Sequence, residues 1–246
     1  METGAIIFLS IMAVAGAILH SRAHQRHRKW EWEEHTNHNR QLIESVTQLD
    51  RGTWSERDLI LELLRAGFKP GALFHDLYIK KHNGQNTQID SVLATNVGLI
   101  VFEVKDYTGW IFGNGGQNQW TQVLAYGRDK YRFYNPVRQN DGHIRALRKQ
   151  SAQFAQLPMF SVIVFYGNCT LRDISFIPNG TYVTTARRVL DVVNTIIDDN
   201  PPANYTDKRE VIRILADAVQ NGADSESREH HAESVKDMLG KNRVFD

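Results

Sequence analysis

Apolar residues in the middle of the chain recur with two different spacings. Over residues 53–66, leucine and isoleucine recur every three to four positions, as in a helix that buries one face. Gly67 and Pro70 then end this pattern. The next runs are rich in β-branched and aromatic residues and are separated by turn-forming residues; they cover residues 73–80, 87–95 and 98–107. The pattern therefore predicts one helix followed by three successive antiparallel strands.

The chain then continues to alternate between strand-like and helix-like segments. Residues 109–112 and 120–126 are expected to form further sheet around a turn rich in glycine and asparagine. Asn135-Pro136 opens a helix that reaches to about Phe154, because proline is favoured in a first turn. Two more strands and a helix are predicted at residues 160–166, 180–184 and 187–197. These elements predict an α/β (mixed α+β) fold, with a central mixed sheet flanked by helices.

The N-terminal end of the chain has a different character. Residues 4–19 contain no charged residue, and a cluster of basic residues follows between His20 and Lys29. The apolar stretch is slightly shorter than the ~20 residues of a typical membrane-spanning helix, so flanking side chains would have to reach the headgroups. A cleaved signal peptide is the alternative, but its positive charge would precede the apolar stretch. The order of charges predicts one membrane anchor, with the rest of the chain on the cytoplasmic side.

These features divide the chain into four parts. We expect an N-terminal membrane anchor at residues 1–22, a polar juxtamembrane helical spacer at residues 23–52, and the folded domain at residues 53–200. The Pro201-Pro202 pair then breaks the chain, and residues 201–246 are expected to form a helical polar tail. The tail is a candidate surface for a protein partner or for self-association.

Composition and charge narrow the class of protein without naming a function. Of 246 residues, 41% are hydrophobic and 23% are charged, which fits a folded chain and not a disordered one. The formal net charge is +1, so any contact with nucleic acid has to come from local patches. The single cysteine, Cys169, excludes an intramolecular disulfide and a zinc site built from several cysteines.

Candidate chemistry lies on two of the predicted strands. Glu103 and Lys105 are two positions apart, so their side chains share one face of a strand. The predicted hairpin places Asp90 of the preceding strand beside them. Burial of two carboxylates and an ammonium without partners is costly, so we expect this cluster to hold an ion or to meet a phosphate. Oxygen ligands of this kind suit Mg²⁺, with Mn²⁺ as a substitute.

Five separated strings occur in one order along the chain: Gln88-Ile89-Asp90, Glu103-Val104-Lys105, Asp106-Tyr107-Thr108-Gly109, Trp120, and Asn135-Pro136-Val137-Arg138-Gln139. This order resembles that of the nuclease-related domain, a family assigned to the PD-(D/E)xK nuclease superfamily. The resemblance covers about residues 53–166. It implies a restriction-endonuclease-like core and Mg²⁺-dependent hydrolysis of phosphodiester bonds in nucleic acid, with DNA as the expected substrate.

The resemblance also implies roles for individual residues. Asp90 and Glu103 correspond to the metal ligands, and Lys105 corresponds to the catalytic lysine. Glu56 corresponds to an acidic residue of the first helix that completes the metal site. Gln139 corresponds to a glutamine that orients the attacking water or a phosphate.

Several of these positions also have a purely structural interpretation. Thr53 and Glu56 have the spacing of a capping box, so Glu56 could serve only to cap its helix. Asp90 and Lys105 could form a salt bridge in an inactive domain, since ion-pair networks resemble active sites. Ser55 stands where the family has a glycine, which weakens the assignment of Glu56.

Candidate substrate contacts are Gln88, Gln139 and His143. Gln139 and His143 are four residues apart and would share one helix face, although ordinary surface positions are the alternative for both. Trp110 and Trp120 could stack on bases, but packing over the sheet is the commoner outcome for such rings.

A structural subunit whose helical tail, from Tyr205 onward, engages other proteins is one possibility, and two further functions of different classes are the main candidates. One is a membrane-tethered, metal-dependent nuclease on the cytoplasmic side, for which a role in bacterial defence or DNA processing fits. The other is a catalytically inactive module that recruits nucleic acid or a protein to the membrane. Cleavage that requires Mg²⁺ favours the enzyme, whereas tight DNA binding without Mg²⁺ and without cleavage favours the binding module.

Overall fold

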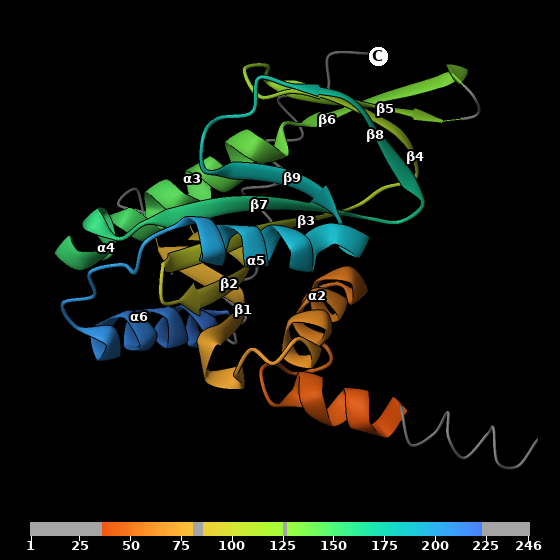
Figure 1. The fold of residues 1–246 in the computed structure, drawn as a ribbon. Helices are drawn as coiled ribbons and strands as arrows, with labels where there is room; N and C mark the ends of the chain where they lie inside the picture. Colours follow the sequence, from red (N-terminus) through yellow and green to blue (C-terminus); the bar gives the residue numbers. More distant parts are fainter. Residues whose placement is uncertain (1–35, 81–85, 125–126, 223–246) are drawn as a thin grey trace, which may run out of the picture.

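The computed structural model describes residues 36–80, 86–124 and 127–222 (Figure 1). The expected membrane anchor at residues 4–19, the first part of the spacer and the end of the tail lie outside these residues. Within the described ranges, no helix has both the length and the apolar character needed to cross a membrane. The domain described below is the part of the chain that carries the candidate chemistry.

Five strands form the main sheet, in the order β1-β2-β3-β7-β9. They are β1 (Leu73–Lys80), β2 (Asn86–Thr95), β3 (Gly98–Asp106), β7 (Met159–Tyr166) and β9 (Thr181–Thr185). The first three pair in antiparallel fashion, whereas β7 and β9 join in parallel. The mixed sheet and its three successive antiparallel strands therefore confirm the prediction from the sequence.

Four further strands form a second sheet, in the order β6-β5-β4-β8. They are β4 (Gly109–Asn114), β5 (Gln119–Leu124), β6 (Asp129–Tyr134) and β8 (Cys169–Ser175). The strands expected near residues 109–112 and 120–126 are thus present as β4 and β5, but they belong to a second sheet and not to the one central sheet expected, and β6 and β8 were not predicted. Gly109 marks the separation: its φ of +79° and the close approach of the Val123 carbonyl, 2.4 Å from where a Cβ would lie, require glycine.

The helices follow the predicted positions with one correction. Their bounds are α2 (Trp54–Arg65), α3 (Pro136–Arg148), α4 (Ala152–Gln156), α5 (Val189–Asp199) and α6 (Lys208–Asn221), with 3-10 turns η1 (Pro70–Ala72) and η3 (Ala186–Arg188). Residues 36–44 are also helical. The single helix expected from Asn135 to Phe154 is in fact two, because α3 ends at Arg148 and Ser151 caps a new helix.

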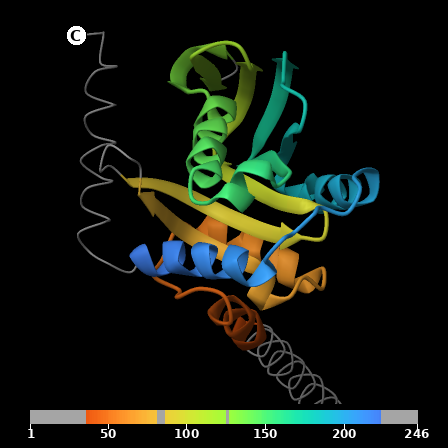
Figure 2. The ribbon, with the colours of Figure 1, turned by 90° about the vertical axis from the view of Figure 1, so that its left-hand side faces the viewer.

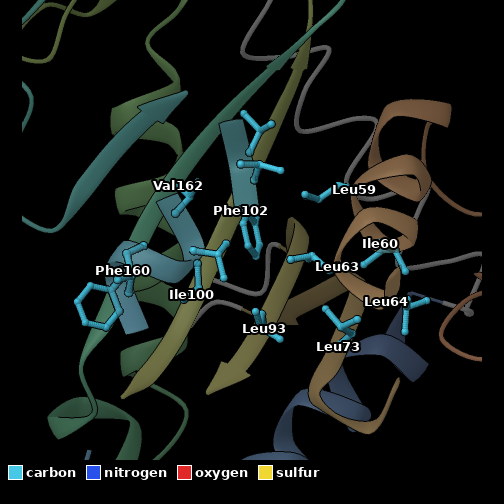
Figure 3. Packing of buried hydrophobic residues seen from close by; sticks show 14 of the residues in the cluster. Leu59, Ile60, Leu63, Leu64, Leu73, Leu93, Ile100, Phe102, Phe160 and Val162 are labelled. Atoms are coloured by element: carbon cyan, nitrogen blue, oxygen red, sulfur yellow. The ribbon is translucent and has the colours of Figure 1, made fainter. Parts of the chain in front are cut away.

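Helices cover both faces of the main sheet. On one face, Leu59 and Leu63 of α2 pack against Phe102 of β3 and against α5 (Figure 3). On the other face, α3, α4 and α6 pack over β1, β2 and β3. A third apolar cluster, which includes Trp120 and Phe165, joins the main sheet to the second sheet. Two covered faces explain why the strands of the main sheet are nearly continuous apolar runs.

Helix α6 lies within the stretch that the sequence predicted as a polar tail. Its residues Val211, Leu215 and Ala218 are buried, and they join the cluster that covers β1. In both Figure 1 and Figure 2, α6 lies at the end of the molecule opposite the second sheet. The first part of the expected tail therefore belongs to the folded core, because the three buried residues share one face of the helix.

Candidate active site

The candidate site begins where β2 and β3 stop pairing with each other. The last residues paired between these strands are Ser91 and Phe102, so Asp90 and Glu103 lie next to each other just beyond them. The backbone N–H of Val104 donates to Oδ2 of Asp90 at 2.7 Å. This bond fixes the Asp90 carboxylate against β3, at the end of the sheet where polar side chains replace apolar ones.

Glu103 is the most deeply buried of the aspartate, glutamate, lysine and arginine residues that the structure describes, with 1% of its surface exposed. Its Oε1 atom lies 2.5 Å from Nζ of Lys105, and its Oε2 atom lies 3.1 Å from Nε2 of His143. Glu103 and Lys105 therefore face the same way, and Asp90 lies beside them, as the strand alternation predicted. Both carboxylate oxygens of Glu103 are engaged by cationic or polar partners.

The charges in this cluster change one another's pKa values. Burial raises the pKa of Asp90 well above its usual range, and the negative charges of Glu103 and Glu56 raise it further. Burial alone would also raise the pKa of Glu103, but the Lys105 ammonium and the His143 bond outweigh it and lower the value. Burial would lower the pKa of Lys105, yet Glu103 and Asp90 keep it above its usual value. Negative charge is thus in excess around Asp90.

Glu56 of α2 lies close enough to add to this negative charge. The Thr53 hydroxyl donates to Oε1 of Glu56 at 2.8 Å and accepts from its N–H at 3.3 Å, so Glu56 does take part in capping its helix. The other oxygen, Oε2, is buried 3.3 Å from Nε2 of His75, but the two atoms do not form a hydrogen bond. Gly52, with φ of +63°, packs against both groups, because a Cβ there would lie 2.5 Å from Oε2. Glu56 therefore combines a capping role with an oxygen that lacks a hydrogen-bond donor.

His143 of α3 is buried, so the interpretation of this residue as an ordinary surface histidine is wrong. Its Nδ1 atom lies 3.0 Å from the Thr87 hydroxyl, while its Nε2 atom faces Glu103. Gln139, one turn earlier in α3, is half-buried. The helix thus directs His143 at a carboxylate of the site and presents Gln139 from the same face.

The comparisons with known proteins concern the same part of the chain. Residues 51–166 match the family model described as the nuclease-related domain. This part of the chain is a nuclease-related domain, of the PD-(D/E)xK-like nuclease group. An uncharacterized protein of Bacillus anthracis is 35% identical over 103 residues, which are 42% of this chain and 47% of that protein. The chain thus spans about half the length of this curated relative. No solved structure matches the chain significantly.

The nuclease-related domain also contains a buried network that the sequence did not predict. Asp76 lies opposite Asp90 between β1 and β2, and its φ of +55° is rare for a residue other than glycine. Arg51 forms an ion pair with Asp76 at 2.9 Å, and the Gln88 amide donates to Asp76 at 2.8 Å. Gln88, expected to contact substrate, therefore binds a neighbouring side chain. The sign in the sequence was the polar pair His75-Asp76 inside an apolar strand.

A second contact explains the departure from the family pattern at the start of α2. Ser55 is buried, and its hydroxyl donates to Oδ2 of Asp106 at 2.6 Å. This bond ties the first turn of α2 to the end of β3, immediately after Lys105. Serine in place of glycine thus adds a link between the helix that carries Glu56 and the strand that carries Glu103.

The oxygen atoms of this site determine which metal fits it. Among the described residues, no group of three or more histidine, cysteine, aspartate or glutamate side chains is arranged to hold a metal ion. Mg²⁺, however, is commonly bound through one or two carboxylates, with water completing its coordination. Asp90 and Glu103 supply such a pair, and Glu56 adds a buried oxygen without a hydrogen bond. The donor set therefore fits Mg²⁺ and does not fit a metal that is fully ligated by protein side chains.

Proposed function

We propose that the nuclease-related domain hydrolyses phosphodiester bonds of DNA in a Mg²⁺-dependent reaction. The observation that supports this function is the convergence of Asp90, Glu103 and Lys105 where β2 and β3 stop pairing with each other. These are the residue types that a metal-assisted phosphodiesterase needs, and each comes from a rigid strand. The family match over residues 51–166 is consistent with nuclease-related chemistry.

Each residue has a distinct proposed role. Asp90 and Glu103 would hold Mg²⁺, whose chemistry when bound is to neutralise charge on the phosphate and to make a bound water more acidic. Lys105 stands beside Glu103 and would stabilise the negative charge that develops on the phosphate. Glu56 would complete the acidic group, and Gln139 would orient the water or a phosphate oxygen. His143, held by Thr87, keeps the Glu103 carboxylate in position.

We also propose that residues 4–19 tether the domain to a membrane, with the domain on the cytoplasmic side. The support is the uncharged stretch followed by basic residues between His20 and Lys29. Protease protection of the full chain in sealed vesicles tests this orientation. Cleavage of the domain from the cytoplasmic side is expected, and a domain shielded on the opposite side would contradict the proposal.

A second candidate function has an observation of its own. The Lys105 ammonium lies 2.5 Å from Glu103, and His143 occupies the other oxygen, so the cluster is partly neutralised without a metal. Such an ion pair would also suit an inactive domain that binds nucleic acid or a protein partner. This alternative predicts DNA binding that is independent of Mg²⁺ and is not accompanied by cleavage.

The deciding experiment uses the full chain in detergent with labelled single-stranded DNA, duplex DNA and RNA. Cleavage of DNA that requires Mg²⁺ or Mn²⁺ is expected, and Lys105→Ala should abolish most of it. Lys69→Ala, which removes an exposed lysine at the start of η1, is the matched control and should cleave at the wild-type rate. Binding without cleavage of any substrate would favour the inactive module.

A further inference from the structure

The second sheet has one face that packs on the domain and one face that does not. Ile111, Trp120 and Phe133 belong to the cluster that joins this sheet to β7. Because side chains alternate along a strand, their neighbours in β4, β5 and β6 face the other way. Val123 is the one outward side chain of these three strands that is buried, and its partners across the strands are Trp110 and Lys130. In Figure 1 the second sheet lies at the end of the domain, with the body of the domain below it.

The strand register places the outward side chains in two rows. One row runs Lys130, Val123, Trp110 and Thr170 across β6, β5, β4 and β8, and the next runs Arg132, Thr121, Phe112 and Arg172. Tyr134 and Gln119 continue the pattern on β6 and β5. We call this surface the outer face of the second sheet.

Three cations and three aromatic rings characterise the outer face. Lys130, Arg132 and Arg172 are exposed, and the Arg172 guanidinium lies 4.4 Å from the centre of the Trp110 ring. Trp110 and Phe112 are half-buried, whereas Tyr134 has 42% of its surface exposed.

Carboxylates are scarce around these groups. Asp129 alternates with Lys130, so its position on β6 belongs to the inner face. Asp173 lies at the bulge beside Arg172 and has a φ of +46°. The outward rows themselves contain no acidic residue. A local positive surface of this kind is what a chain with a net charge of +1 would need in order to contact nucleic acid.

We propose that the outer face of the second sheet binds single-stranded DNA and leads it to the candidate active site; this inference rests on the proposed nuclease function. Aromatic rings interleaved with cations on an open sheet suit unpaired bases, which stack while the backbone meets the cations. Bases paired within a duplex do not present their faces to such rings. Trp110 follows Lys105 by five residues, so their Cα atoms lie no more than about 18 Å apart.

The binding test uses the full chain, a fluorescent single-stranded oligodeoxynucleotide, and EDTA to prevent cleavage. Tyr134→Ala should weaken binding about tenfold, which corresponds to the loss of one stacked base. Arg132→Ala should reduce the slope of log K against log salt by about 0.7, as expected for one phosphate contact to a single strand. Because Arg132 is exposed on an edge strand, its variant tests the face even where Tyr134→Ala lowers the melting temperature.

Two matched variants control for general loss of charge or of an aromatic ring. Arg213→Ala removes an exposed arginine from α6, far from the second sheet, and should leave the salt slope unchanged. Tyr131→Ala removes a ring with 54% exposure from the opposite face of the same strand, and should weaken binding less than Tyr134→Ala. Equal effects of the two tyrosine variants, or wild-type binding by Tyr134→Ala and Arg132→Ala, would overturn the proposal.

Comparison of ligands separates this proposal from the proposed function. Single-stranded DNA should bind at least as tightly as RNA of the same sequence and more tightly than duplex DNA. Tighter binding of RNA or of the duplex would overturn the assignment of the ligand. Absence of cleavage with Mg²⁺, combined with binding that depends on Tyr134 and Arg132, would refute the nuclease but keep the surface. Cleavage that does not change in Tyr134→Ala or Arg132→Ala would keep the nuclease function and refute the role of the outer face.

Discussion

Two similar groups of buried side chains flank Asp90. They differ in whether their buried polar atoms all have hydrogen-bond partners. In one, His143 connects the Thr87 hydroxyl to Glu103, with bonds of 3.0 and 3.1 Å. In the other, His75 lies 2.8 Å from the Thr47 hydroxyl and 3.3 Å from Glu56. We call them the Glu103 triad and the Glu56 triad.

The difference between the triads lies in the second contact of each histidine. His143 forms a hydrogen bond with Glu103, which also pairs with Lys105, whereas His75 and Glu56 face each other without one. Buried polar atoms without partners are rare and usually have a reason, such as a bound ion or water. The comparison teaches that Glu103 is a fixed anchor of the site, while Glu56 has an oxygen available for a ligand.

The largest effect is expected at Lys105, which contacts the Glu103 triad and not the Glu56 triad. Lys105→Ala should lower the rate of DNA cleavage on the order of 10²-fold or more, because it removes a charge partner of the transition state. Metal binding should persist, since a cation beside Mg²⁺ is repelled by it. Single-turnover cleavage and metal-induced stabilisation are measured on the same protein. Wild-type rates in Lys105→Ala would refute the role of the lysine.

Stability should respond differently when each glutamate is changed. Glu103→Gln should cost about 2 kcal/mol of unfolding free energy in EDTA, because it removes the charged partner of the buried His143 and of Lys105. Glu56→Gln should cost about 1 kcal/mol or less, since it weakens the contacts with Thr53 and the 3.3 Å contact with His75, which is not a hydrogen bond. Urea titrations of both variants, compared with the wild type, give the two values. Equal losses would show that the triads do not differ as their contacts suggest.

The sequence predicted the Glu103 triad only in part and the Glu56 triad hardly at all. Strand alternation was enough to bring Glu103, Lys105 and Asp90 together, because that relation is local to one hairpin. His143 comes from a helix 40 residues after Glu103, and no local pattern gives the angle at which a helix crosses a sheet. The contact between Thr47 and His75 joins residues 28 positions apart, so it could not be predicted from a local pattern either.

The same contrast holds for the fold. The main sheet was predicted well because both of its faces are covered, and its strands are therefore strongly apolar. Strand β6, with the sequence DKYRFY, is exposed at nearly every position and lacks an apolar pattern. Helix α6 has an amphipathic pattern, with Val211, Leu215 and Ala218 at helical spacing, but the pattern does not say which strands its apolar face covers. Exposed strands and long-range packing therefore set the limit of sequence-based prediction in this chain.

A smaller effect, on the melting temperature, is expected at Asp90, which lies between the two triads. Its pKa is raised in the folded state, so the carboxyl stabilises the fold fully below the unfolded value, near pH 4, and this stability is lost as pH rises through the folded value. In EDTA at pH 7, Asp90→Asn should therefore melt higher than the wild type, on the order of 3 °C. The gap should close as the pH falls toward about 4.

Mg²⁺ should reverse the order of these two proteins. The wild type is expected to gain stability on binding Mg²⁺, because the cation offsets the repulsion between Asp90 and its acidic neighbours. Asp90→Asn should lose most of that gain. Thermal melts in EDTA and in Mg²⁺, at pH 4 and pH 7, separate the two effects. The same rise with Mg²⁺ in the variant would place the metal elsewhere.

The smallest effects are expected at the two threonines, which occupy equivalent places in the triads. Thr47→Val and Thr87→Val each remove a hydroxyl bonded to a histidine ring, and each should cost about 1 kcal/mol. Their effects on cleavage should differ, because His143 positions Glu103 through a hydrogen bond whereas His75 has none to Glu56. Thr87→Val should therefore slow cleavage several-fold while Thr47→Val leaves it near the wild-type rate, and Thr87→Ser, which keeps the hydroxyl, should restore it. Equal cleavage rates in the two valine variants would show that the bond between His143 and Glu103 does not help to hold the site in its active arrangement.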